Sequence, residues 1–221
     1  MRVVVFGASG MVGKGVLLEC IDDPRVTQVL VIGRSACGVT GDKVEEVLLP
    51  DLTDYSSIEA KLEGLDACFF CLGVSSVGMS EEAYRKVTLE LTVAAAEALK
   101  KKSPGLTFIY VSGQGTDESE KGAIMWARVK GETENRLIAM GFRAAFMFRP
   151  GVIEPLRGVR PKATLTKVAY AVGWPLFPLL RALSPRLLTN TEAVGKAMIK
   201  LAAEGSDRRY FENGDINALV R

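Results

Sequence analysis

The residues Gly7-Ala8-Ser9-Gly10-Met11-Val12-Gly13 lie between an apolar run at Arg2–Phe6 and a helix-like segment at residues 11–21. A glycine motif in this strand–turn–helix context is a dinucleotide-binding signal. The first glycine permits a tight turn, the second lets the backbone approach a pyrophosphate, and the third lets helix and strand pack closely. The helix N-terminus also presents unpaired N–H groups to phosphate oxygens. We therefore predict that residues 7–13 bind a dinucleotide, with a purely structural turn as the alternative.

Strand-like and helix-like segments alternate outward from this turn. Apolar runs predict strands at residues 27–32, 44–49, 66–71, 106–111 and 143–148, and a last strand at 209–211. Helices are predicted at residues 56–62, 80–102, 123–140 and 191–204, the first opened by the capping-box spacing of Ser56 and Glu59. Such alternation is typical of a parallel sheet with helices on both faces, doubly wound through right-handed crossovers. The predicted fold class is α/β, a doubly wound parallel sheet (Rossmann fold) with a small C-terminal helical cap.

Length and charge narrow the class of protein. A chain of 221 residues suits one domain with a small appendage. We predict a single nucleotide-binding domain over residues 1–221, with a cofactor-binding core at 1–153 and a cap with a closing helix at 154–221. The net charge of +2 argues against a nucleic-acid partner. The chain has no histidine, the commonest metal ligand, and we predict no metal site.

Four cysteines bear on the compartment: Cys20, Cys37, Cys68 and Cys71. Cys68 and Cys71 have the spacing of a redox or zinc pair. They fall in an apolar strand, however, where alternation points the two sulfurs to opposite faces. We expect buried thiols, which suit a reducing compartment. Because the N-terminus also lacks the layout of a signal peptide, we predict a cytoplasmic protein, with peripheral membrane contact as an option.

The end of the second predicted strand indicates which dinucleotide binds. NAD sites usually carry an acidic residue there, which holds the ribose 2′-hydroxyl. This chain instead has Val31-Ile32-Gly33-Arg34-Ser35. The planar guanidinium of Arg34 suits a 2′-phosphate, and Ser35 can donate a further hydrogen bond. We predict a preference for NADP(H) over NAD(H); a solvated loop arginine is the alternative.

Residues 156–188 combine basic residues with an apolar stripe near helical spacing and contain no Asp or Glu. The basic residues are Arg157, Arg160, Lys162, Lys167, Arg181 and Arg186. Such a segment can lie on an anionic membrane surface, contact a protein partner or roof an apolar pocket. A helix packed on the sheet is the plainer alternative. The sequence is compatible with a monomer or a homodimer.

Several motifs resemble one known family. The turn resembles that of the extended and atypical short-chain dehydrogenase/reductases. Four further segments are similar to a small atypical group around the Tat-interacting-protein oxidoreductases, which are NAD-dependent epimerase/dehydratase-like. They are Val31-Ile32-Gly33-Arg34, Phe70-Cys71-Leu72-Gly73, Val129-Lys130-Gly131-Glu132 and Phe148-Arg149-Pro150-Gly151-Val152-Ile153. The resemblance covers residues 1 to about 153 and thins beyond them.

This resemblance implies cofactor contacts at particular residues. Residues 7–13 would contact the pyrophosphate, and Arg34 the 2′-phosphate. Asp51 and Leu52 would lie beside the adenine, and Cys71, Leu72 and Gly73 along its ribose. Pro150, Gly151, Val152 and Ile153 would lie along the nicotinamide. Independently of the family, all these segments follow strand ends, where ligands bind in open α/β sheets.

The family's chemistry uses Ser, Tyr and Lys, the last two four residues apart on one helix face. The resemblance places Ser112 and Lys130 at the Ser and Lys positions, where Lys130 would also bind the nicotinamide ribose. Trp126 stands in place of the tyrosine. An indole N–H has no accessible acid–base pKa, so Trp126 cannot carry a proton as a phenol does. Plain packing of Trp126 and a local hydrogen bond of Ser112 are the structural alternatives.

Two functions remain open from the sequence. The first is an NADPH-dependent oxidoreductase acting on a small carbonyl or quinone-like compound, which Ser112 and Lys130 favour. The second is a non-catalytic NADPH-binding redox sensor or scaffold protein, which Trp126 favours.

Overall fold

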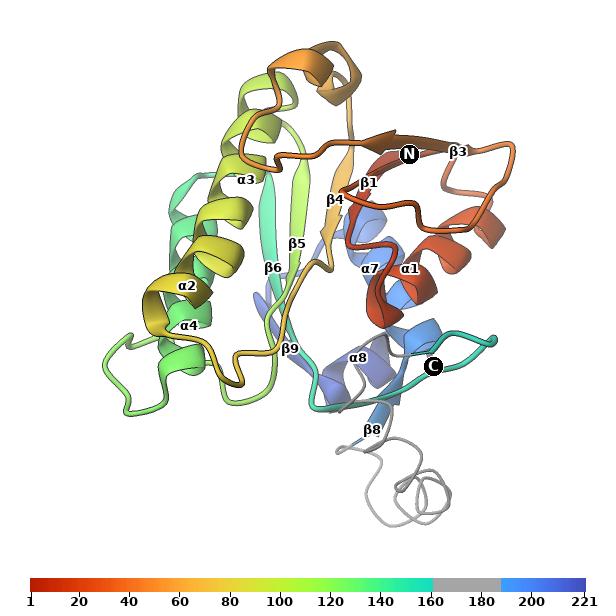
Figure 1. The fold of residues 1–221 in the computed structure, drawn as a ribbon. Helices are drawn as coiled ribbons and strands as arrows, with labels where there is room; N and C mark the ends of the chain where they lie inside the picture. Colours follow the sequence, from red (N-terminus) through yellow and green to blue (C-terminus); the bar gives the residue numbers. More distant parts are fainter. Residues whose placement is uncertain (161–187) are drawn as a thin grey trace.

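The computed structural model describes residues 1–160 and 188–221 of the protein. Within them, a seven-stranded sheet has the order β3-β2-β1-β4-β5-β6-β9, and every neighbouring pair is parallel (Figure 1). Its strands are β1 (Arg2–Phe6), β2 (Gln28–Gly33), β3 (Val44–Leu48), β4 (Ala67–Phe70), β5 (Thr107–Val111), β6 (Ala144–Arg149) and β9 (Tyr210–Glu212). Two short strands, β7 (Val152–Glu154) and β8 (Leu188–Asn190), form a second parallel pair.

Helices cover both faces of the main sheet (Figure 1). One face carries α1 (Met11–Asp22) and α7 (Thr191–Glu204), drawn in red and blue. The other carries η1 (Ser56–Leu62), α3 (Leu91–Lys102) and α4 (Met125–Ala139). The remaining helical elements are α2 (Glu81–Arg85), η2 (Lys86–Glu90) and α8 (Asn213–Leu219). The predicted doubly wound Rossmann fold is therefore confirmed.

The central strand β1 explains why the first predicted strand has no polar alternation. Val3 and Val5 point into the core beneath α1 and α7. Val4 and Phe6 point into the opposite core, beneath η1 and α3. A parallel strand covered on both faces has no solvated side, so all its inner positions must be apolar.

The predicted helix at residues 80–102 is interrupted. Ser80 caps its start by accepting a hydrogen bond from the main-chain N–H of Ala83 at 3.2 Å. The segment then passes through the π-helical turn η2 before continuing as α3. The Thr92 hydroxyl, in the first turn of α3, donates to the main-chain oxygen of Thr88 in η2 at 2.5 Å. The predicted helix is therefore confirmed over residues 81–102, and the π turn within it is a detail that helical composition cannot reveal.

The capping box predicted at residues 56–59 was also wrong. The segment forms a 3₁₀ helix, and no side chain caps it. The Glu59 carboxylate instead pairs with Lys101 and Lys102 of α3, at 3.0 and 2.8 Å. The main-chain N–H of Ser56 donates to Asp54 at 2.9 Å. The Glu59 carboxylate is therefore engaged in ion pairs with α3 and does not form the predicted capping box.

All four cysteines are free thiols, and three of them are buried; Cys71 is half-buried. Cys68 and Cys71 lie in opposite cores, as strand alternation predicts. Burial raises the pKa of Cys71 to about 12 and also raises the pKa of Cys68. Neither thiol therefore supplies a thiolate near neutral pH.

The C-terminal residues extend the main sheet. β9 pairs with β6, and α7 packs along α1. The division into a core at 1–153 and a cap at 154–221 stays a prediction. Residues 161–187 hold most of the basic segment 156–188, so its predicted membrane or protein contact lies outside the described residues.

Residues 1–160 and 188–221 contain no cluster of Cys, Asp or Glu side chains suited to a metal ion. None of their helices has the length and hydropathy needed to cross a bilayer.

Candidate functional site

The glycine turn has the geometry that a phosphate-binding turn needs. Gly7 has a φ of +79°, and a Cβ there would lie 2.7 Å from the main chain of Cys71 and Leu72. A Cβ on Gly13 would lie 2.3 Å from the Gly7 carbonyl oxygen. These two glycines are thus required by backbone contacts. Gly10 precedes α1 in an extended conformation, and no side chain caps this helix N-terminus.

We expect Gly13→Ala to destabilise the protein. The new methyl group would overlap the Gly7 carbonyl, and overpacking of this kind costs about 1–3 kcal/mol. Urea unfolding followed by circular dichroism measures the loss. Gly105→Ala is the matched control, because a Cβ at Gly105 meets no atom within 4 Å. An unchanged unfolding midpoint for Gly13→Ala would contradict the close approach of α1 to β1.

The predicted cofactor segments meet at one edge of the sheet. Because every strand of the main sheet is parallel, the chain leaves each at the same edge (Figure 1). Residues 34–35, 51–52, 71–73 and 150–153 follow β2, β3, β4 and β6 there. The strand order reverses between β1 and β4, next to the glycine turn. In open α/β sheets, ligands bind at this reversal point.

Two positively charged side chains, those of Arg34 and Lys14, lie near the loop after β2. Arg34 and Ser35 are exposed. Among the described residues, the Arg34 guanidinium has no hydrogen-bonding or ionic partner. Lys14, in the first turn of α1, reaches the same loop, where its ammonium lies 3.5 Å from the Cys37 carbonyl oxygen. The Cys37 main-chain N–H donates to Glu46 of β3 at 2.7 Å, which holds the loop in place.

The residues predicted to lie around the adenine and its ribose differ in their exposure to solvent. Asp51 is exposed, and its carboxylate accepts from the Thr53 N–H and hydroxyl at 2.8 and 2.7 Å. These bonds lower the pKa of Asp51. Leu52 is buried in the core beneath η1. Gly73 is exposed, whereas Cys71 and Leu72 are half-buried beside the glycine turn.

The segment predicted along the nicotinamide is held from two sides. The Gln114 N–H donates to the Pro150 carbonyl oxygen at 2.9 Å. The Gly151 N–H donates to Asn213 of α8 at 3.1 Å. Val152 and Ile153 belong to β7, which pairs with β8. Sequence reasoning missed Asn213, because nothing local relates it to a residue 62 positions earlier.

Ser112 and Lys130 are brought together, but through the main chain of Ser112. The Lys130 ammonium donates to the Ser112 carbonyl oxygen. The Ser112 hydroxyl points the other way: it donates to Glu134 at 2.5 Å and lies 3.1 Å from the Phe148 carbonyl oxygen. The local hydrogen bond weighed for Ser112 is thus present. Burial of its ammonium lowers the pKa of Lys130 to about 8.

Trp126 lies one helical turn before Lys130 and is half-buried. Its ring packs against the small cluster of Tyr84, Leu89 and Val129. A Cβ built on Gly115 would lie 3.6 Å from the edge of the indole. Trp126 therefore packs beneath the loop that follows β5 and carries no acidic or basic group to the position of the tyrosine.

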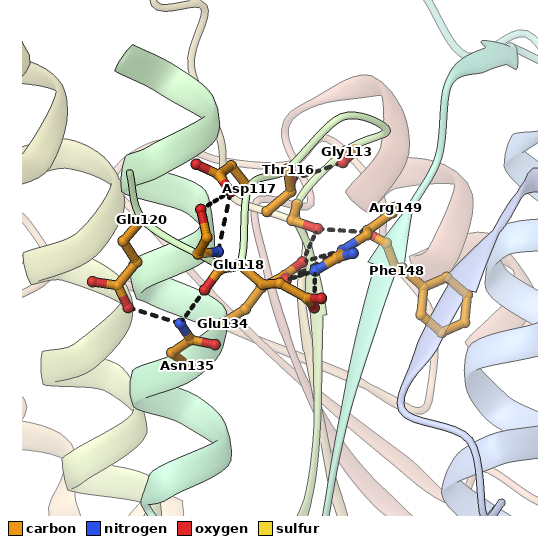
Figure 2. A network of polar contacts seen from close by, with 11 residues as sticks. Gly113, Thr116, Asp117, Glu118, Glu120, Glu134, Asn135, Phe148 and Arg149 are labelled. Atoms are coloured by element: carbon orange, nitrogen blue, oxygen red, sulfur yellow. Dashed lines mark hydrogen bonds and ion pairs between the residues drawn. The ribbon is translucent and has the colours of Figure 1, made fainter. Parts of the chain in front are cut away.

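Two residues of this region were missed from the sequence, Glu134 and Arg149. Figure 2 shows the Arg149 guanidinium directed at the Glu134 carboxylate. The two side chains come from α4 and β6 and form an ion pair. The sequence feature that could have indicated Glu134 is its position on the predicted helix, one turn after Lys130.

Comparison with known proteins gives consistent matches. A model of the NAD dependent epimerase/dehydratase family matches residues 3–120. Protein FMP52, mitochondrial, from Meyerozyma guilliermondii is 25% identical over 232 residues, covering 95% of this chain and 98% of that protein. Protein HTATIP2 from Rattus norvegicus is 27% identical over 154 residues, covering 68% of this chain and 62% of that protein. The resemblance expected from the sequence motifs is confirmed.

Solved structures share the fold. The Bordetella bronchiseptica enzyme WbmF in complex with NAD+ superposes with a TM-score of 0.70 at 16% identity, covering 99% of this chain and 76% of that one. The Bordetella bronchiseptica enzyme WbmH in complex with NAD+ gives a TM-score of 0.67 at 15% identity, covering 96% and 74%. At these identities the likeness establishes the architecture alone.

The matches correct one prediction. A cytoplasmic location was expected from the thiols and the N-terminus. The fungal relatives from Meyerozyma guilliermondii and Chaetomium globosum are named as mitochondrial proteins, at 25% and 27% identity over nearly the whole chain. Free thiols fit any compartment that keeps cysteines reduced, so they could not distinguish between the two locations.

Proposed function

Because the chain belongs to the NAD dependent epimerase/dehydratase family, we propose that it is an NADPH-dependent oxidoreductase acting on a small carbonyl or quinone-like compound. One observation carries this proposal. The glycine turn and the half-buried Lys130 lie at the same edge of the sheet, beside the point where the strand order reverses. A dinucleotide along this edge would extend from α1 toward Lys130.

The residues at this edge fit a dinucleotide. Among the described residues no side chain caps the N-terminus of α1, and its N-cap residue is glycine, so the first N–H groups suit a pyrophosphate. Lys130 has the charge and position to donate to the hydroxyls of the nicotinamide ribose. NADPH, when bound, supplies a hydride, and the protein's own residues then bind and orient the dinucleotide.

The preference for NADPH rests on charge. No acidic residue stands at the end of β2 to accept a ribose 2′-hydroxyl. Arg34 is exposed and has no partner among the described residues, so its guanidinium is available to a 2′-phosphate. Lys14 adds a second positive charge beside the same loop. Both charges favour a phosphorylated ribose over an unmodified one.

We expect Arg34→Ala to weaken NADPH binding by roughly ten- to a hundred-fold, because a charged hydrogen bond contributes about 1.5–3 kcal/mol. Binding of NADH should remain nearly unchanged. Calorimetric titration of each cofactor measures both effects. Arg209→Ala is a matched control, since Arg209 is also exposed but precedes β9, at the opposite edge of the sheet. Equal affinities of the parent protein for NADPH and NADH would refute the preference.

A second function has its own support. Trp126 carries no transferable proton, and the Ser112 hydroxyl is bonded to Glu134. These features favour a non-catalytic NADPH-binding sensor or scaffold. Oxidation of NADPH by the parent protein, measured with ketones, aldehydes and quinones, distinguishes the two functions. Turnover with any of these acceptors supports the enzyme, and NADPH binding without turnover supports the sensor.

A further inference from the structure

Glu134 is a fully buried carboxylate for which the proposed function has no use. It lies on α4, one helical turn after Lys130, with a side chain that solvent does not reach. Acidic side chains are almost never fully buried unless they are paired. A buried carboxylate so close to the site therefore requires a reason.

Its partners come from two neighbouring strands. The Arg149 Nε lies 3.1 and 3.2 Å from the two Glu134 oxygens, and Arg149 Nη2 donates as well. The Ser112 hydroxyl donates to Glu134 Oε1 at 2.5 Å. Charge-assisted bonds of this kind are strong and orient their partners closely. Glu134 thus joins α4 to the ends of β5 and β6.

Arg149 is itself held in place. Its guanidinium lies 4.1 Å from the centre of the Tyr210 ring, on β9. It also forms an ion pair with the half-exposed Glu118 at 3.3 Å. The guanidinium is therefore stacked on one side and paired on the other, so it cannot turn away from Glu134 without losing both contacts.

The loop that follows β5, residues 112–124, also packs closely against α4 next to Lys130. A Cβ on Gly131 would lie 1.8 Å from the Asp117 carbonyl oxygen, so only glycine allows this approach. Thr116 donates from its hydroxyl to the Gly113 carbonyl oxygen at 2.7 Å, which tightens the turn between them (Figure 2). Lys130 then donates to the Ser112 carbonyl at the start of this loop.

We propose that Glu134 is the positioning residue for Lys130. Its carboxylate, held by Arg149, fixes Ser112 so that the Ser112 carbonyl receives the Lys130 ammonium, and its negative charge keeps that ammonium protonated. The purpose of this arrangement rests on the proposed function, in which Lys130 faces the dinucleotide. The contacts themselves are made between residues of the protein alone and do not depend on a bound cofactor.

The two influences on Lys130 oppose one another. Burial lowers the pKa of Lys130 and is the larger effect, whereas the Glu134 charge raises it. Arg149 on β6 pairs with Glu134, and Glu118 after β5 pairs in turn with Arg149. Ser112, which follows β5, is uncharged. Removal of the Glu134 charge should therefore lower the pKa of Lys130 further below about 8.

The test is the pH dependence of Lys130 acetylation by acetic anhydride, which reacts with the neutral amine. Mass spectrometry measures the extent at Lys130, with the exposed Lys121 as internal reference. In the parent protein the midpoint should lie near 8. In Glu134→Gln it should fall by roughly one pH unit, the size of shift that a nearby opposite charge produces. Labelling of Lys130 at neutral pH should rise accordingly.

The matched control is Glu132→Gln, the same substitution two residues away on α4. Glu132 pairs with Arg85 at 2.6 Å on another face of the helix, so the Lys130 midpoint should stay at the parent value. Glu134→Asp retains the charge and should keep the midpoint closer to the parent value than Glu134→Gln does. A purely structural role of Glu134 would lower the melting temperature without this dependence on charge.

If Glu134→Gln does not fold, the paired variant Glu134→Leu with Arg149→Met removes both members of the buried ion pair, a change that proteins often tolerate. The midpoint should fall in that variant too. Equal midpoints in the parent and in folded Glu134→Gln would overturn the proposal, as would an equal fall in Glu132→Gln. Because no cofactor is present in the assay, a failure of NADPH to bind the parent would refute the proposed function and leave this result standing.

Discussion

Gly10→Val should abolish NADPH binding while the fold survives. A Cβ at this position would meet a single neighbour, the Gly7 carbonyl oxygen at 3.3 Å, and the backbone there is extended. The branched side chain would therefore fit the protein but occupy the space over the first N–H groups of α1. Loss of two charge-assisted hydrogen bonds, each worth about 1.5–3 kcal/mol, would weaken binding by more than about a hundred-fold.

Calorimetric titration with NADPH measures the loss, and thermal unfolding reports whether the fold is retained. Gly105→Ala serves as the control for glycine replacement in open space and should bind like the parent. Gly13→Ala provides a second comparison. It should lower the stability of the fold, whereas Gly10→Val should lower the affinity for NADPH. Full NADPH affinity in Gly10→Val would mean that the turn has a structural role only.

Trp126→Tyr should raise NADPH-dependent reduction of simple ketones and aldehydes. The change restores a phenol one helical turn from Lys130, and general acid–base catalysis contributes roughly 10²–10⁴-fold. The phenol would stand next to an ammonium whose pKa burial has lowered to about 8. Reduction of a quinone, which depends less on a protein acid, should change little.

Parallel assays of NADPH oxidation by both proteins decide between the outcomes. Trp126→Phe is the control, since it changes the packing against Tyr84 and Leu89 without adding an acid. Brisk ketone turnover by the parent would show that another group supplies the proton. Absence of turnover in both proteins, with NADPH bound, would favour the sensor.

The strand positions and the doubly wound parallel class of the sheet could be predicted because their signals are local. Apolar runs separated by helical segments locate the strands, and the glycine turn places the first crossover. The helices predicted at residues 56–62 and 80–102 are present, but each differs from expectation in one local detail. The Glu59 carboxylate forms an ion pair with Lys101 of α3 instead of capping its own helix, and η2 is a π-helical turn within the second helix.

The orientation of the site residues could not be predicted in the same way. Ser112 matches the serine position of the family by sequence, yet its hydroxyl faces Glu134, 22 residues later in the chain. Two further groups, Arg149 and Asn213, act across separations of 15 and 62 residues. Contacts over such separations depend on how β5, β6 and α8 meet in three dimensions, which residue spacing does not encode.

The pairing of β9 with β6 has a consequence for synthesis on the ribosome. Roughly sixty residues separate the two strands, and at about 5–20 residues per second they take on the order of 3–12 seconds to emerge. During that interval the nascent β6 presents a row of unpaired N–H and C=O groups, the kind of edge that recruits foreign strands. Arg149 also lacks the aromatic ring on which it will stack. Until Tyr210 emerges, the growing chain therefore carries an open edge at β6 that the short strand β9 covers in the finished protein.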